Sequence, residues 1–186
     1  KKEGVDEAYI GSDKAFDLYN SEMFAAAAAD VIEKVKPSLV LASSSALGKD
    51  LFPRVAARLK SSVASDCTEL KIGSDLQVRR PFYAGKCSAD VQFKSGIPFV
   101  LMRANQLTIT PATSTKETIM HTIAASSSGL NTLIKEVVRG TSNKLDLTEA
   151  NIIVSGGRGL RDAEGFKIIH PLAEALGATV GASRAV

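Results

Sequence analysis

Residues 151–186 read NIIVSGGRGLRDAEGFKIIHPLAEALGATVGASRAV. Their pattern predicts, in order, a strand, a glycine-rich turn, a helix and a second strand. Arg158 and Arg184 each lie beside small residues at the carboxyl end of one of these predicted strands. Open α/β sheets bind their ligands at that edge. The segment therefore predicts a ligand site where its two strands end.

The first strand and its turn suit a negatively charged ligand. The apolar, β-branched run at 152–154 is typical of a buried parallel strand, and it ends in Ser155-Gly156-Gly157. Glycines permit a positive φ and leave backbone N–H groups uncovered, and we expect the following helix to add its N-terminal dipole. The guanidinium of Arg158 adds donors for a phosphate or pyrophosphate.

By itself, the glycine pattern leaves two interpretations open. Residues 157–162 match only the first two glycines of the dinucleotide fingerprint G-x-G-x-x-G, because Asp162 takes the place of the last one. The alternative is a tight strand-to-helix turn that carries a solvated arginine.

The predicted helix has a defined start and end. Asp162 is a suitable N-cap, and Gly177 is a natural stop. The apolar residues at helical spacing are Phe166, Ile169, Leu172, Ala173 and Leu176. Pro171 has no N–H group, so we expect it to bend the helix or shift its register. Residues 178–181 form the second strand, which places Ala182-Ser183-Arg184 at its end.

The whole string is more specific than its glycines. It closely resembles the start of the FAD-binding domain in the alpha subunit of electron-transfer flavoprotein, through SGGRGL at 155–160, Phe166 and LAEALGATVGASRAV at 172–186. The resemblance continues upstream, in the family's order, through SSSALGKDLFPRVAARL at 43–59, SD at 65–66 and YAG at 83–85. It is weak between residues 86 and 151.

The resemblance implies an electron carrier rather than an enzyme with its own substrate. An alpha subunit of this family pairs with a beta subunit and holds one FAD, while AMP is expected on the beta subunit. It accepts electrons from acyl-CoA dehydrogenases and other dehydrogenases and passes them to electron-transfer flavoprotein-quinone oxidoreductase. The resemblance further implies fatty acid beta-oxidation in the mitochondrial matrix, or the cytoplasm if the source is a bacterium.

The resemblance also implies three cofactor-binding residues and no catalytic residue. Arg158 matches the family's arginine that contacts FAD at the glycine turn, and Ser183 and Arg184 match the serine and arginine beside the flavin ring. A fixed guanidinium at that place stabilises negative charge on the reduced ring and so raises its potential.

The N-terminal part of the chain alternates strands and helices. Residues 8–10 and 39–41 are predicted strands. Ser21 is the predicted cap of a helix that ends at Val35, and Pro53 is predicted in the first turn of the next helix. This order favours a parallel sheet flanked by helices. Further β-rich runs stand at 77–83, 88–93 and 98–102.

Together, the order of elements and the resemblance imply an α/β fold. A nucleotide-hydrolase-like parallel-sheet domain at 1–147 is followed by the first βαβ unit of a Rossmann-like FAD-binding domain at 148–186. Residues 108–129 predict an exposed excursion or linker, and 141–150 the domain boundary. Residues 133–140 fit a strand or a short helix, and the β-branched Val137 and Val138 favour the strand. The resemblance leads us to expect a fragment, incomplete at both ends, that alone binds FAD weakly or not at all.

Composition excludes several function classes. The 186 residues carry a net charge of +3, dispersed basic residues and no tryptophan, which argues against nucleic acid. No apolar run approaches the roughly 18 residues of a membrane span. Cys67 and Cys87 are predicted to be two buried thiols. His121 and His170 are predicted to be structural, because no Cys or His stands at metal-ligand spacing from them.

Two other function classes stay open at this point. One is a nucleotide-binding α/β module without a redox role, with ATP or AMP near residues 43–49, and the other is a structural dimerisation domain. Gly48-Lys49-Asp50 is similar to part of a phosphate-binding loop, but the loop's first glycine is absent and Asp50 replaces its Ser or Thr. The capping of an ordinary helix is therefore the favoured interpretation.

Overall fold

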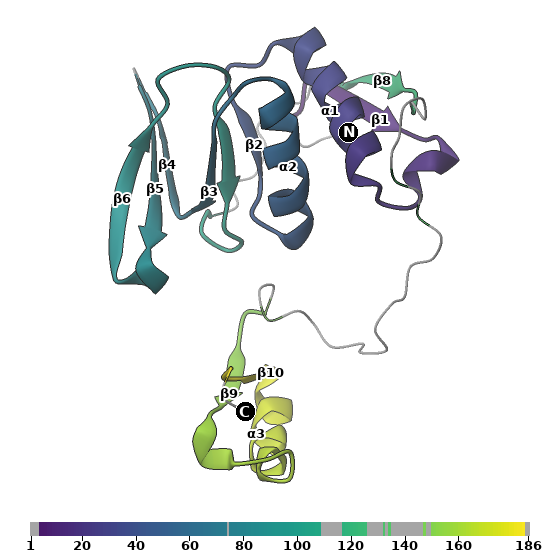
Figure 1. Cartoon of the computed structure of the whole chain (residues 1–186). Coiled ribbons are helices and arrows are strands. Elements are labelled where there is room, and N and C mark those ends of the chain that lie inside the picture. Colours follow the sequence, from purple (N-terminus) through teal and green to yellow (C-terminus); the bar gives the residue numbers. More distant parts are fainter. Residues whose placement is uncertain are drawn as a thin grey trace. The chain divides into compact units, whose positions relative to one another are not determined.

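The chain forms two compact units. The computed structural model describes residues 4–73, 75–108, 117–125, 132, 134, 147 and 150–184. The units are Lys1–Val137 and Val138–Val186. Both mix helices with parallel strands, so the predicted α/β class is confirmed (Figure 1). The predicted strand at 133–140 and the predicted boundary at 141–150 fall almost entirely outside the described residues.

The described residues of the first unit form three sheets, two α-helices and two 3-10 turns. The strands are β1 (Glu7–Gly11), β2 (Val40–Ser43), β3 (Val63–Cys67), β4 (Glu69–Ile72), β5 (Leu76–Phe82), β6 (Cys87–Gln92), β7 (Phe99–Met102) and β8 (Ile119–Ile123). The helices are α1 (Ser21–Val35) and α2 (Ala46–Arg58), and the turns are η1 (Lys14–Phe16) and η2 (Tyr83–Gly85). The sheets are β2-β7-β3 and β1-β8, both parallel, and β4-β5-β6, which is antiparallel.

The core of the first unit lies on both sides of β7. Phe99 packs with Leu51 and Val55 under helices α1 and α2. Val100 packs on the opposite face with Val78 of β5. All four residues of β7 are buried, and a strand that is covered on both faces is expected to be apolar throughout, as FVLM is.

The predicted linker at 108–129 is wrong over its middle part. Ile119–Ile123 form strand β8, which pairs in parallel with β1. Tyr9 of β1 stacks on His121 of β8, with ring centroids 4.6 Å apart. Serine, threonine and alanine on both sides of this short run hide its strand pattern, and its partner strand is distant in sequence.

The predicted β-rich runs are confirmed, but their pairing departs from a purely parallel sheet. The runs at 77–83 and 88–93 correspond to β5 and β6, which pair with opposite directions. Arg79 of β5 ties the sheet together, because its guanidinium reaches Asp90 of β6 at 2.8 Å and Glu69 of β4 at 3.3 Å. Opposite charges on neighbouring strands stabilise such pairs.

Both helices of the first unit begin differently from the prediction. Asn20 is the N-cap of α1 in place of Ser21, because its backbone is extended and its side chain accepts two hydrogen bonds from first-turn N–H groups. Ser45 caps α2, so the helix starts early and Pro53 lies inside it rather than in its first turn.

The second unit contains the predicted strand, turn, helix and strand. Within its described residues these are β9 (Ile153–Gly156), the 3-10 turns η3 (Arg158–Leu160) and η4 (Gly165–Ile168), α3 (His170–Leu176) and β10 (Thr179–Ala182). β9 and β10 are parallel. Ile152 and Ile153 are 48% and 46% exposed, so the prediction of a buried strand is wrong in this part of the chain.

Pro171 divides the predicted helix, as expected. The residues before it form η4, and Pro171 itself lies in the first turn of α3, where its missing N–H group leaves no helical bond unmade. Asp162 is not the N-cap of either helical segment, because Glu164 precedes η4 and Ile169 precedes α3. It accepts hydrogen bonds from the N–H groups of Glu164 and Gly165 and so stabilises the turn that leads into η4. Gly177 ends α3 with a left-handed φ of 60°.

Candidate functional site

The carboxyl ends of β9 and β10 form one edge in the second unit. The strands are in register up to Gly156 opposite Ala182. Arg158 follows β9 after one residue, and Ser183-Arg184 follow β10 directly. The structure therefore brings the three predicted cofactor-binding residues to one sheet edge.

Close packing explains the first glycine of the turn. A Cβ on Gly156 would overlap the side chain of Leu160 and lie 2.8 Å from the ring of Phe166. None of the described glycines of this turn has a positive φ, whereas Arg161 has a φ of 63°. These glycines therefore do not use the positive φ that glycine permits; Gly156 is required because two side chains approach its backbone.

The next glycines leave the backbone of the turn open. The nearest atom to a Cβ on Gly157 would be Ser183 Oγ, 3.9 Å away, and a Cβ on Gly159 would have nothing within 4 Å. Uncovered N–H groups in such a turn suit an anion. The residues after the turn form η3, and α3 begins only at His170, so the predicted contribution of a helix dipole is wrong.

The two arginines of this edge face solvent. Arg158 and Arg184 are exposed, and within the described part of the unit neither forms an ion pair. Lys167, by contrast, pairs with Glu164 at 2.6 Å. Two guanidinium groups beside an open glycine turn offer planar sets of N–H donors for phosphate oxygens. Ser183 adds a hydroxyl group at the same edge, 3.9 Å from the position of a Cβ on Gly157.

The edge near Gly48 does not have the geometry of a phosphate-binding loop. Gly48 lies in the first turn of α2, where its N–H group donates to Ser45 Oγ at 3.1 Å. Lys49 Nζ is paired with Asp66 Oδ1 at 2.9 Å. The interpretation of this segment as an ordinary helix cap is confirmed.

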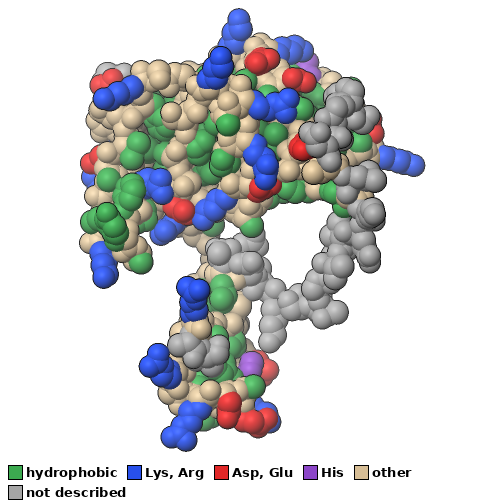
Figure 2. Space-filling model, in the orientation of Figure 1, with side chains coloured by type: hydrophobic (Ala, Val, Ile, Leu, Met, Phe, Trp, Pro, Cys, Tyr) green, Lys and Arg blue, Asp and Glu red, His purple; other side chains and the backbone are tan. Residues whose placement is uncertain are grey.

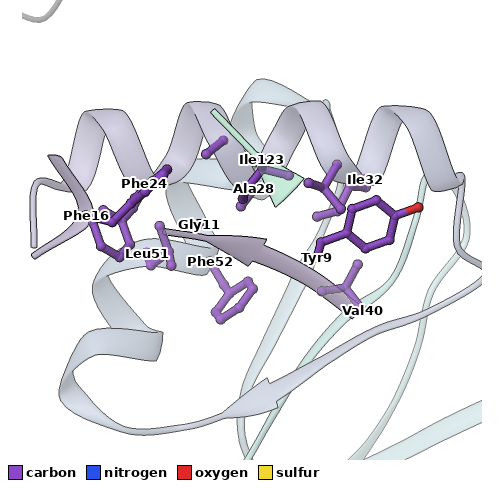
Figure 3. A pocket seen from close by; sticks show the side chains of 12 residues that line it. Tyr9, Gly11, Phe16, Phe24, Ala28, Ile32, Val40, Leu51, Phe52 and Ile123 are labelled. Carbon is purple, nitrogen blue, oxygen red and sulfur yellow. The ribbon is translucent and has the colours of Figure 1, made fainter. Parts of the chain in front are cut away.

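One cavity in the described part of the first unit is lined by apolar side chains. It has a volume of about 520 Å³ and lies among β1, α1, β2, α2 and β8. Figure 3 shows side chains such as Phe24, Ile32, Val40 and Leu51 around it, with no charged group among the lining residues. Such a lining does not suit a nucleotide phosphate, because a buried phosphate needs paired charges or N–H donors.

Roles for the histidines and cysteines of the described residues were also predicted from the sequence, and the structure tests those predictions. No group of His, Cys, Asp and Glu there has the arrangement of a metal site. His121 stacks on Tyr9 and lies 3.2 Å from Glu7, in agreement with a structural role. Cys67 is buried but Cys87 is exposed on the edge strand β6, so the prediction of two buried thiols is wrong for Cys87.

Charged side chains of both signs lie on the surface of the described residues (Figure 2). Figure 2 shows Lys and Arg side chains interspersed with Asp and Glu over the face drawn. A search of the described helices finds none with the length and apolarity needed to traverse a bilayer.

Sequence reasoning missed the central position of Asp66, which pairs with Lys49 and lies 3.7 Å from Arg103. Ion pairs between residues brought together by the fold leave no periodic pattern in a sequence. It also did not predict how closely Ser155 approaches Gly181: Ser155 Oγ lies 2.8 Å from the position of a Cβ on Gly181, which explains why β10 carries a glycine.

Comparison with known families matches both parts of the chain. Residues 1–128 match the electron transfer flavoprotein domain, and residues 146–186 match the electron transfer flavoprotein FAD-binding domain. The second match contains the whole edge with Arg158, Ser183 and Arg184.

Individual relatives carry the same description. The electron transfer flavoprotein subunit alpha of Bacillus subtilis is 36% identical over 182 residues, covering 97% of this chain and 56% of the relative. That of Thermoanaerobacterium thermosaccharolyticum is 34% identical, covering 98% and 57%. The mitochondrial protein of Arabidopsis thaliana is 34% identical, covering 97% and 52%. The chain spans about half the length of the curated relatives that it matches, and it belongs to the electron transfer flavoprotein family, resembling the alpha subunits along nearly all of its own length.

Proposed function

We propose that this chain forms part of the FAD-binding alpha subunit of a heterodimeric electron carrier. The observation that carries the proposal is the shared edge of β9 and β10, where Arg158 and Ser183-Arg184 lie beside an open glycine turn. The match of residues 146–186 to a FAD-binding domain supports FAD as the ligand of this edge.

The residues present fit a dinucleotide such as FAD. Gly157 and Gly159 leave room for a ligand to approach the backbone, since no atom lies within 3.9 Å of a Cβ on Gly157 and none within 4 Å of one on Gly159. Arg158 would donate to the pyrophosphate, and Arg184, with Ser183, would lie beside the flavin ring. Bound FAD supplies the electron-accepting group, and the role of Arg184 is to stabilise negative charge on it.

The remaining parts of the proposal concern the whole protein. Its partners would be a beta subunit that carries AMP, acyl-CoA and other dehydrogenases as electron donors, and electron-transfer flavoprotein-quinone oxidoreductase as acceptor. Such a protein transfers electrons and has no substrate of its own. The proposed domains are residues 1–147, an N-terminal α/β domain, and 148–186, the start of the FAD-binding domain.

The cellular compartment is a further part of the proposal, because the relatives come from different compartments. The name of the Arabidopsis relative places that protein in mitochondria, and other relatives are bacterial. We propose the mitochondrial matrix for a eukaryotic source, where the carrier would serve fatty acid beta-oxidation, and the cytoplasm for a bacterial one.

An absorbance spectrum tests the proposed function. The protein that carries this chain, purified together with its beta subunit, should show a flavin spectrum and release FAD on denaturation. The isolated 186-residue chain should retain little or no FAD, because the arginines on the described edge are exposed and enclose little of a ligand. A heterodimer that contains an adenine nucleotide but no flavin would contradict the proposal and favour a nucleotide-binding module.

A further inference from the structure

A second cluster of charged side chains lies at the carboxyl edge of the β2-β7-β3 sheet. Ser44 follows β2, Arg103 follows β7, and Asp66 lies one residue before the end of β3. Backbone hydrogen bonds join these ends, because Ser44 N–H donates to Met102 O at 2.7 Å and Arg103 N–H donates to Cys67 O at 2.9 Å. Ligands of open α/β sheets are bound at edges of this kind.

Asp66 is the centre of this cluster. Its Oδ1 lies 2.9 Å from Lys49 Nζ and 3.7 Å from Arg103 Nε. Ser44 Oγ donates to the same oxygen at 3.2 Å and accepts from Asp66 N–H at 3.2 Å. Burial raises the pKa of this carboxyl, but the hydrogen bond and charge of Lys49, helped by Ser44 and Arg103, outweigh burial and lower the pKa overall. Asp66 is therefore a carboxylate at neutral pH, and Lys49, Arg103 and the hydroxyl of Ser44 hold it in place.

The backbone of Asp66 adopts an uncommon conformation to reach this position. Its φ is 59°, in the left-handed region that most residues with a Cβ avoid and that Asp and Asn tolerate best. The pairing of β3 with β7 shifts register between Ala64 and Cys67, so Asp66 stands out of the regular ladder. Strained backbone conformations cluster at active sites, ligand clamps and switch regions.

We propose that the carboxylate of Asp66 occupies the position at this edge where a phosphate group would otherwise bind. It thereby prevents Lys49 and Arg103 from binding phosphate compounds. The side chains of Lys49 and Arg103 are 47% and 49% exposed, which leaves both within reach of a ligand in solvent. Gly48 lets the first turn of α2 approach the end of β2, because a Cβ there would collide with Ser43 O. Loss of the carboxylate would leave the ammonium group of Lys49, the guanidinium of Arg103 and the hydroxyl of Ser44 around one vacated position.

Binding of inorganic pyrophosphate to the full chain tests this proposal by isothermal titration calorimetry. Asp66→Gly suits the left-handed φ and removes the carboxylate. It should bind pyrophosphate at least about tenfold more tightly than the unchanged chain, because two fixed cations are freed. Asp90→Asn is the matched control, because it removes the same charge from an aspartate that is also paired with an arginine, Arg79 at 2.8 Å. The control should bind like the unchanged chain.

Double variants test whether the gain in pyrophosphate affinity depends on Lys49 and Arg103. Adding Lys49→Gln or Arg103→Gln to Asp66→Gly should abolish the gain in affinity. A gain that persists in these double variants, or an equal gain in Asp90→Asn, would overturn the proposal because overall charge would then explain it. If circular dichroism shows that Asp66→Gly does not fold, Asp66→Asn decides: Asn tolerates the same φ, and an affinity equal to that of Asp90→Asn would overturn the proposal.

Discussion

The N–H group of Ser183 donates a hydrogen bond of 3.0 Å to the carbonyl oxygen of Gly156. This bond joins the residue after β10 to the last residue of β9. It therefore fixes the backbone on both sides of the edge from which the side chains of Arg158 and Arg184 project. The relative position of the two arginines depends on how closely this turn packs.

Gly156 and Gly159 should respond differently to substitution. Gly156→Ala would place a methyl group against Leu160 and 2.8 Å from the ring of Phe166, whereas Gly159→Ala would meet no atom within 4 Å. Overpacking of this kind costs about 1–3 kcal/mol. Hydrogen exchange of amides in residues 150–184 should therefore accelerate in Gly156→Ala and not in Gly159→Ala. Equal exchange in the two variants would contradict the packing described for this turn.

Tyr19 should stabilise the first unit in a pH-dependent manner. Burial, followed by a 2.7 Å hydrogen bond to Asp50, raises the pKa of Tyr19 from 10.0 to about 12. The pKa of Tyr19 is higher in the folded state than in the unfolded state. The stabilisation by its neutral phenol is therefore fully present below pH 10.0 and is lost as the pH rises towards about 12. The free energy of unfolding in urea should therefore fall more steeply over that range for the unchanged chain than for Tyr19→Phe.

The control for this experiment is Tyr83→Phe, since the side chain of Tyr83 is 80% exposed. Its free energy of unfolding should follow that of the unchanged chain across the alkaline range. If Tyr19→Phe shows the same slope as the unchanged chain, the hydrogen bond to Asp50 does not hold the proton of Tyr19.

The two thiols should react at different rates. Cys67 is fully buried, and burial, with a smaller effect from Asp66, raises the pKa of its thiol against the opposing charge of Arg80. Cys87 is exposed. A thiol reagent should therefore modify Cys87 rapidly in the native protein and Cys67 at least about tenfold more slowly. Cys87→Ser should remove the fast phase, and a fast phase that remains would show that Cys67 is accessible.

Local patterns in the sequence predicted the order of the elements in the second unit, but not the burial of β9. The β-branched run before the glycines, the stop at Gly177 and the disruption at Pro171 each depend on residues close in the chain. The shared edge of Arg158 and Arg184 followed from the parallel order of two strands joined by a helix, which is a topological rule. For that reason the positions of the candidate site residues were predictable before their surroundings were known.

Features that depend on distant partners were not predictable in this way. β8 becomes a strand by pairing with β1, and Asp66 is paired with Lys49 of α2 and lies near Arg103, which follows β7. The exposure of Cys87 depends on β6 being an edge strand. Strand pairing and edge position depend on the whole sheet, and no window of sequence contains them.

FAD affinity of the heterodimer measures the central claim most directly. The protein carrying this chain should be assembled with its beta subunit, and the dissociation constant of FAD measured by flavin fluorescence for Arg158→Ala, Arg184→Ala and Arg161→Ala. Loss of a charge-assisted contact should weaken FAD binding about tenfold to a hundredfold in the first two variants. Arg161 lies in the same turn and has no assigned contact with FAD, so Arg161→Ala should bind FAD as the unchanged protein does. Equal affinities for all three variants would contradict the assignment of this edge as part of the FAD site.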